Sequence, residues 1–358
     1  MIPRLFEKTE TQFANFGICP LIDAISCTVT EERNGEFTLA MEYARNGRWS
    51  EEIVVDRIIL ADPYDNAEQA EPFRIVSVSY NMVGNLTVNA QHISYQLNYV
   101  ICGAYAGYSR YPQTAWDQLQ ANAMLTSNPF TFYTDISDAE GTVYRYGPKV
   151  AVPLRTLLGG MKGSFLDNYG GEYKWERYKV SLLSSRGSDN GVRIAYGKNL
   201  TGLTYDVDLS ETVTGAVAYS DGDSYVQGSL QTLTHTYGFE RAVVLDASSE
   251  FSGTTPTTAQ LNSYANAYLA NKGTPAVSIS VEFVPLWQTD EYKAYEDLEH
   301  VSLCDTVQVV YPPLNLTLKA KVVRTVYNVL ADRYDTITIS SVKSSLADTI
   351  YSLMEGKA

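Results

Sequence analysis

Residues 75–82 read IVSVSYNM, and residues 322–329, near the other end of the chain, read VVRTVYNV. In both stretches apolar and polar side chains alternate with a period of two, which is typical of a β-strand with one buried face. The pair Tyr80-Asn81 falls at the same place in the first stretch as Tyr327-Asn328 in the second. One strand that occurs twice in a chain predicts a duplicated β-domain.

The segments around these two strands can also be aligned in the same order. Residues 24–43 overlay residues 200–219 without a gap, and residues 56–94 overlay residues 305–344 with small gaps. A single alternating strand is a generic pattern, but two blocks in the same order favour a true duplication. The overlay brings together Thr28 and Thr204, Thr38 and Thr214, Ala40 and Ala216, Tyr43 and Tyr219, and Asp56 and Asp305.

Between and after the two copies the pattern changes. Residues 114–125 and 154–171 have helical spacing and are followed by two short strands, which predicts a mixed α+β insert. Residues 255–273 and 344–356 also have helical spacing. We therefore expect four domains: a first β-barrel ring domain at 1–96, an α+β peripheral domain at 97–199, a second β-barrel ring domain at 200–253 and 299–343, and a small helical or α+β peripheral domain at 254–298 and 344–358.

Composition and charge narrow the function. A chain of 358 residues with 45% hydrophobic residues is globular and long enough for several domains. The formal net charge of −14 leaves no basic face to hold phosphates, so specific nucleic-acid binding is not expected. No apolar run reaches the length of a membrane span. The start, MIPRLFEKTETQFANFG, has no apolar signal core, so we expect synthesis in the cytosol and no secretion by that route.

The residue types that most often carry catalysis do not form a recognisable pattern. His92, His235 and His300 occur without an HExxH motif and without metal-ligand spacing, and no GxSxG elbow is present. We therefore name no catalytic, cofactor-binding or metal-binding residue, and we expect no enzyme. The four cysteines are too scattered for a disulfide framework and are expected to be buried free thiols: Cys19, Cys27, Cys102 and Cys304.

Three other features have a functional and a structural interpretation. Residues 220–224, SDGDS, could supply oxygen ligands to calcium, but these residue types are also usual in turns. Some aromatic side chains, such as that of Trp287, are expected to be exposed, and they could bind carbohydrate. An acidic run could hold a carboxylate pair for glycoside cleavage, although a solvated face is favoured; its members are Asp290, Glu291, Glu296, Asp297 and Glu299.

Residues 154–222 resemble the phage minor structural proteins of the prophage tail-associated family, whose label mentions an endopeptidase. Residues 301–309, VSLCDTVQV, resemble a later motif of that family, with Cys304 where glycine is expected. The resemblance covers roughly residues 20–345. The motifs that carry it are Gly163-Ser164, Gly170-Gly171-Glu172, Arg186-Gly187, Gly191-Val192 with Ile194, and Tyr196-Gly197-Lys198-Asn199-Leu200.

The resemblance implies the fold of the baseplate hub protein of contractile-tailed phages. That fold is α+β and mostly antiparallel β, with two similar tail-tube-like β-barrels and two peripheral α+β domains. It implies a homotrimer at the virion tail tip, in which six similar units surround a passage that DNA crosses without specific binding. The implied partners are a distal tail ring protein, the C-terminus of the tape-measure protein, and tail fibre or receptor-binding proteins. Neither a cofactor nor stable membrane insertion is implied.

Two alternatives stay open at this point. Longer relatives carry a lytic domain after the hub region, so a cell-wall hydrolase, or tail endopeptidase, is one of them. The chain ends at Ala358, soon after the hub-like region, so we expect no such domain here. A host-surface carbohydrate-binding module is the other alternative.

Overall fold

The computed structural model of the chain divides into two compact units, Met1–Gly202 with Val281–Ile339, and Leu203–Ser280 with Ser340–Ala358. The predicted helix at 344–356 and the acidic run at 290–299 fall outside the described residues. The described residues are 2–65, 67–80, 82, 84–124, 128–137, 144–145, 147–161, 163–221, 224–248, 250–251, 255–273, 276–283, 285–288, 300–314 and 316–341.

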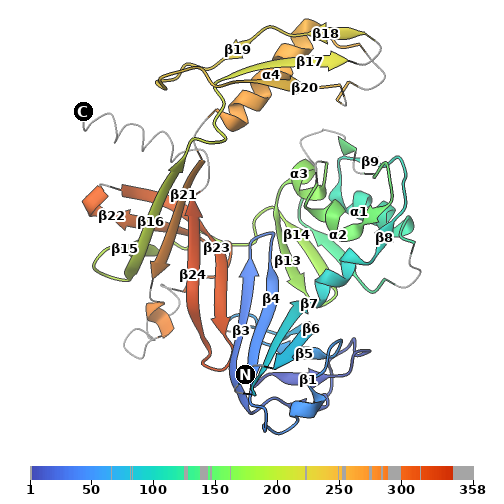
Figure 1. Cartoon of the computed structure of the whole chain (residues 1–358), viewed down its shortest axis with the longest axis vertical. Helices are drawn as coiled ribbons and strands as arrows, with labels where there is room; N and C mark the ends of the chain where they lie inside the picture. The colour runs from blue at the N-terminus through green and yellow to red at the C-terminus, as the bar shows by residue number, and fades with distance from the viewer. Residues whose placement is uncertain are drawn as a thin grey trace. The chain divides into compact units, whose positions relative to one another are not determined.

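The first unit is built on one curled sheet, which has eleven strands in the described part of the chain. Its two halves come from opposite ends of the sequence: β3 lies beside β23, far from it along the chain (Figure 1). The strand order is β15 (Arg193–Ala195), β22 (Thr306–Tyr311), β23 (Leu316–Asn328), β3 (Ala24–Glu32), β4 (Phe37–Tyr43), β7 (Leu86–His92), β6 (Glu71–Tyr80), β5 (Ile58–Ala61), β1 (Arg4–Phe6) and β2 (Cys19–Pro20), while β24 (Arg333–Ser341) pairs with β23.

The alternating pattern predicted for these strands is confirmed by their burial. In β4 the side chains of Phe37, Leu39, Met41 and Tyr43 are buried, and the residues between them are not. The pair Asn34-Gly35 between two alternating stretches predicts a hairpin at 33–36, and this hairpin joins β3 to β4, with Asn34 in the left-handed region at φ 58°. Asparagine tolerates this conformation better than most residues, so the turn follows from local chemistry.

The insert after β7 begins with η2 (Ile93–Asn98) and carries a three-stranded sheet of β10 (Thr131–Thr134), β14 (Lys179–Leu183) and β13 (Glu172–Glu176). The helix predicted near 114–125 is α1 (Pro112–Ala121). The single helix predicted at 154–171 is wrong: α2 (Leu154–Leu158) and α3 (Phe165–Tyr169) are separate. Gly160 lies between them at φ 136°, which a continuous helix does not allow. Two small sheets complete the insert, β8 (Ile101–Cys102) with β12 (Val152–Pro153) and β9 (Tyr108–Ser109) with β11 (Tyr144–Arg145).

The second unit packs one helix, α4 (Thr258–Lys272), on a four-stranded sheet. The helix predicted at 255–273 is confirmed, and a capping box between Thr257 and Gln260 fixes its start. Its buried face, Leu261, Ala265 and Leu269, packs on Ala216 and Ala218 of the sheet. The four strands are β18 (Tyr225–Gln227), β17 (Gly215–Asp221), β19 (Gln231–Thr232) and β20 (Ala242–Asp246).

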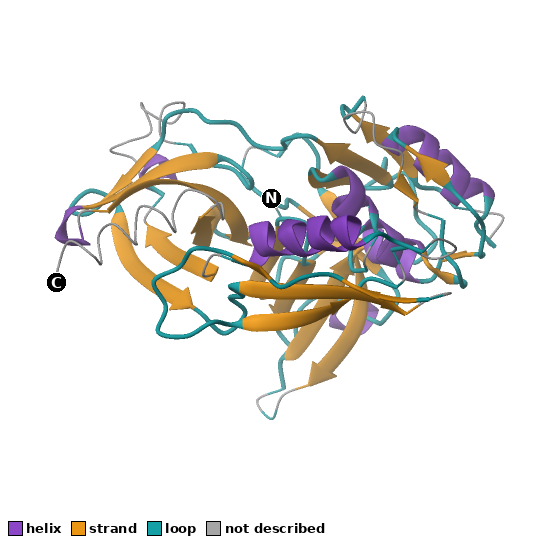
Figure 2. Ribbon diagram, turned by 90° about the horizontal axis from the view of Figure 1, so that it is seen from above, coloured by secondary structure: helices purple, strands orange, loops and turns teal. Residues whose placement is uncertain are grey.

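Strands dominate both units (orange in Figure 2), so the mostly β class is confirmed. The division into two barrels and two peripheral domains stays a prediction. In the first unit, strands from both predicted barrels belong to one curled sheet, so the sheet by itself does not separate them. Three short 3₁₀ helices, η1 (Ser50–Glu52), η3 (Leu286–Gln288) and η5 (Pro312–Leu314), complete the described elements. In the described residues no helix is long and apolar enough to cross a membrane.

The duplication is visible as two blocks of three strands in the same order, β5-β6-β7 and β22-β23-β24. In the first block the backbone N–H of Asp56 donates to the carbonyl of Ile75 over 2.8 Å, and in the second that of Cys304 donates to Val322 over 2.9 Å. Asp56 and Cys304 share a left-handed backbone, at φ 74° and 75°. Asp56 is therefore equivalent to Cys304, and the overlay of Asp56 on Asp305 is wrong by one residue.

The overlay of 24–43 on 200–219 is wrong in its second half. β3 forms a hairpin with β4, but β17 pairs with β18, β19 and β20 instead of with β16 (Leu200–Asp208). The strand that pairs with β16 is β21 (Ala276–Phe283). The four-stranded sheet and α4 therefore lie between β16 and its partner β21 in the sequence, so sequence adjacency does not give the pairing.

Candidate functional site: a buried charge cluster beneath the insert

The three histidines do not come together as a catalytic group. Each faces one carboxylate: His92 lies 3.1 Å from Glu71, His235 3.2 Å from Glu240, and His300 3.1 Å from Asp65. His92 and His300 belong to the first unit and His235 to the second. No group of three or more His, Cys, Asp or Glu side chains that could hold a metal ion is present in the described part of the chain.

The aromatic and thiol candidates are buried. Trp287, which was expected to be exposed, is 4% exposed, and its indole N–H donates to Asp65 over 3.0 Å. Because this ring lies inside the first unit, the carbohydrate-binding interpretation of Trp287 is wrong. All four cysteines are free and buried, as predicted. Burial raises the pKa of the Cys27 and Cys304 thiols to about 12, so neither is a nucleophile near neutral pH.

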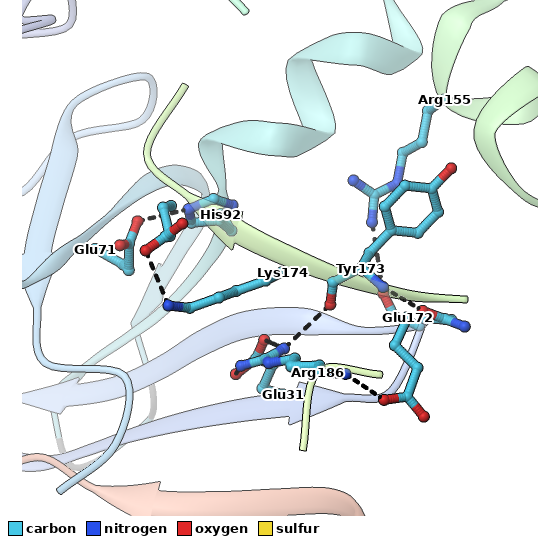
Figure 3. Close-up of polar contacts among 11 residues, drawn as sticks. Glu31, Glu71, His92, Arg155, Glu172, Tyr173, Lys174 and Arg186 are labelled. Carbon is cyan, nitrogen blue, oxygen red and sulfur yellow. Dashed lines mark hydrogen bonds and ion pairs between the residues drawn. The ribbon is translucent and has the colours of Figure 1, made fainter. Parts of the chain in front are cut away.

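A cluster of buried charged and polar side chains lies where the insert covers the curled sheet (Figure 3). Arg186, which follows β14, forms a two-bond contact with the Glu31 carboxylate on β3, at 2.5 and 3.0 Å. Both side chains are almost completely buried. Burial lowers the pKa of the Arg186 guanidinium, but the Glu31 charge more than offsets this, so the net shift is upward. The guanidinium is therefore charged in the folded protein.

Glu172 on β13 is the second centre of this cluster. Its carboxylate accepts from the backbone N–H of Arg186 at 2.8 Å and pairs with Lys321 at 2.6 Å and Arg33 at 2.9 Å. Burial raises the pKa of Glu172, but Lys321, the Arg186 N–H and Arg33 together bring it below its ordinary value. Because Arg33 lies in the β3–β4 turn and Lys321 on β23, one carboxylate connects the insert to both halves of the sheet.

Glu71 on β6 forms the third centre and is different, because its acid group is uncharged. Burial raises its pKa to about 8, and burial lowers the pKa of His92 to about 3. The Ser94 N–H donates to Nδ1 of His92, so the neutral ring carries its proton on Nε2 and donates it to Glu71. The same Glu71 oxygen accepts from the backbone N–H of Arg177 at 2.6 Å, in the β13–β14 turn.

Arg155 on α2 attaches the helical part of the insert. Its guanidinium lies 4.0 Å from the ring centroid of Tyr95 and 5.0 Å from that of Trp175, and it donates to the Ser94 hydroxyl at 3.0 Å. Burial lowers its pKa. A cation between two aromatic faces is a stable arrangement without a carboxylate partner, so this arginine has a structural role.

Two of the motifs that carried the family resemblance, Gly170-Gly171-Glu172 and Arg186-Gly187, contribute to this cluster. Arg186 and Glu172 supply its charges. A Cβ on Gly187 would lie 2.2 Å from the carbonyl carbon of Cys304, and one on Gly171 would lie 2.6 Å from the carbonyl oxygen of Leu183. Cys304 has a left-handed backbone, which explains why glycine is expected there.

A polar cavity of about 270 Å³ borders the cluster. Its walls include Glu31 and Arg186 of the cluster, Lys174 of β13 and the Tyr334 ring of β24. Every charge named above has an opposite charge or hydrogen-bond partner, and no activated nucleophile is among these side chains. Chemically the arrangement holds the insert on the sheet.

Sequence reasoning missed Glu31, Glu71 and Arg155, which were not considered as site residues. A signal for Glu31 did exist, since it falls at the third inward position of β3, after Cys27 and Val29. A carboxylate at a buried position needs a partner, but the sequence does not show that the partner is Arg186.

Comparison with known proteins finds one family model that matches part of the chain. Residues 188–350 match the family model described as prophage endopeptidase tail. No curated protein matches the chain at a significant level.

Solved structures are similar over almost all of the chain. Prophage tail protein gp18 from Listeria monocytogenes has 16% identity, covers 99% of both chains and has a TM-score of 0.58. The tail protein from Neisseria meningitidis has 10% identity, covers 96% of both chains and has a TM-score of 0.60. The tail protein of prophage MuSo2 from Shewanella oneidensis has 8% identity, covers 88% of this chain and 93% of its own, and has a TM-score of 0.58. At these identities the likeness shows a shared fold. The resemblance to the prophage tail family is thus confirmed, by sequence over residues 188–350 and by fold over almost the whole chain.

Proposed function

We propose that this chain is the structural hub of the tail tip of a phage or of a phage-derived device. Three chains form a ring of six similar units that joins the tail tube or distal tail ring to the tip and surrounds the DNA passage. The main support is the fold, which the chain shares over most of its length with two prophage tail proteins and one further tail protein. The repeated strand blocks support a ring with more similar units than chains.

The proposed role is not enzymatic. Two residues that the family motifs supply, Glu172 and Arg186, are held in ion pairs and hydrogen bonds that join the insert to the sheet, as a rigid joint requires. The family description does mention an endopeptidase, so this part of the proposal has its own test. The purified chain is expected to release no dye from labelled peptidoglycan under conditions in which a known endopeptidase does so. Release that depends on the chain would contradict it.

The proposed partners are a distal tail ring protein, the C-terminus of the tape-measure protein, and fibre or receptor-binding proteins. The ring itself is tested by light scattering on a sizing column at low and high protein concentration. We expect a mass three times the chain mass of 39.7 kDa, and negative-stain images with a central hole. A monomer at every concentration, with and without a distal tail protein, would overturn the proposal.

A further inference from the structure

Two equivalent strands of the sheet differ in how many neighbours they have. β23 has three neighbours: it pairs with β24, with β22 through residues 316–321 and with β3 through residues 324–328. Its equivalent in the first block, β6, pairs with β5 through residues 71–74 and with β7 through residues 73–80. No described strand pairs with β6 beyond Arg74 on the β5 side. The place that β3 takes on β23 is therefore open on β6.

The exposure of equivalent side chains on β6 and β23 differs in the same way. Because Ile75 is equivalent to Val322, Tyr80 is equivalent to Tyr327 five residues later. Tyr327 is 0% exposed, whereas Tyr80 is 66% exposed. Val76, where the register of β6 against β7 shifts, is 49% exposed. A strand with open backbone groups and exposed apolar side chains is a site for pairing with another chain.

A strand of the right kind is present at the start of the second repeat. The gap-free part of the overlay makes β16 equivalent to β3, and β16 pairs with β21 as β3 pairs with β4. β3 has a second neighbour, β23, but β16 has no second neighbour among the described strands. The open edges of β6 and β16 are thus equivalent to the edges of β23 and β3, which pair with each other within the chain.

We propose that β16 of a second copy of this chain pairs antiparallel with residues 77–80 of β6. This rests on the proposed ring, and it specifies the strands and the register that hold neighbouring chains together. The internal pair Val326–Thr30 translates to Ser79 opposite Asp206 of the second copy, and Tyr327–Val29 translates to Tyr80 opposite Tyr205. Since the two edges differ, the contact is head-to-tail, and its repetition gives the proposed three-chain ring if each step rotates by one third of a turn.

The register can be tested by a disulfide between chains. Opposite Cα atoms of antiparallel strands lie about 4.5–5.5 Å apart, within the range that a disulfide spans. In the double variant Ser79→Cys with Asp206→Cys, both new thiols lie at exposed positions, whereas the native cysteines are buried. After mild oxidation we expect crosslinked multimers on a non-reducing gel. Each single variant, and Ser79→Cys with Thr204→Cys, which is two residues out of register, should give few or none.

A second measurement uses the Tyr80 side chain. Tyr80→Asp should raise the protein concentration needed for half-assembly by at least about tenfold, because a charge replaces a buried interface aromatic. Tyr99→Asp is the matched control, since Tyr99 is also exposed, at 79%, and lies outside the proposed contact. It should leave assembly unchanged.

The possible results separate the two proposals. Multimers in light scattering without the Ser79–Asp206 crosslink, or with an equal crosslink in the out-of-register variant, overturn the strand pairing and leave the ring. A chain that stays monomeric and does not crosslink overturns both. The in-register crosslink together with weakened assembly of Tyr80→Asp establishes the contact.

Discussion

Removal of the Arg186 guanidinium should be the most destabilising single change in the buried charge cluster. Arg186→Met keeps much of the side-chain volume but deletes the two bonds to Glu31 and leaves that carboxylate, 3% exposed, without its opposite charge. Loss of one partner of a buried ion pair costs about 3–5 kcal/mol. We expect the free energy of unfolding of the first unit to fall by that amount.

The assay is urea denaturation followed by tryptophan fluorescence. All four tryptophans, Trp49, Trp116, Trp175 and Trp287, belong to the first unit, so the signal reports on that unit alone. The exposed pair Lys319–Asp189 provides the control, and Lys319→Met should move the unfolding midpoint very little.

A double variant shows whether the cost comes from the unpaired charge. Glu31→Leu with Arg186→Met removes both charges and should recover most of the stability, because a buried ion pair contributes little more than a well-packed apolar pair. A loss below about 1 kcal/mol for Arg186→Met, or a double variant as unstable as the single one, would refute the reasoning.

Two further changes test other parts of the joint. Glu71→Gln should remove a pH dependence of stability. The pKa of Glu71 is about 8 in the folded protein and ordinary in the unfolded chain, so the wild type loses stability as the pH rises towards 8. The window from pH 6.5 to 8 lies above the ordinary pKa of His92, so His92 contributes little to the change there. Thermal unfolding across that window should show a falling midpoint for the wild type and a flatter one for the variant; equal slopes would disprove it. Gly187→Ala should cost about 1–3 kcal/mol or more, because its methyl group would meet the Cys304 peptide. Gly103→Ala in the same unit is the control and should cost far less, because its methyl group would lie 3.5 Å or more from its neighbours; similar midpoints for the two would count against the close contact.

Asn34 shows both what sequence can predict and where it stops. Its place before Gly35 between two alternating strands predicted a hairpin, and it occupies a left-handed turn. Its side chain also accepts from the Tyr173 N–H at 2.8 Å and donates to the Gly171 carbonyl at 3.1 Å. No local pattern shows that a turn residue also binds a strand of the insert well over one hundred residues later.

The sequence by itself determined the alternating strands, the turn at 33–36, the helix at 255–273 and the resemblance to the prophage tail family, which the family model matches over residues 188–350. These depend on side-chain period and backbone preference, which act over a few residues, or on motifs read directly. The tertiary structure alone decided that β17 pairs in the four-stranded sheet and not with β16, that β23 lies beside β3, and that Glu31 pairs with Arg186. Strand pairing and charge neutralisation join segments far apart in the chain, and many partners would satisfy the same local pattern. Only the packed structure selects one of them.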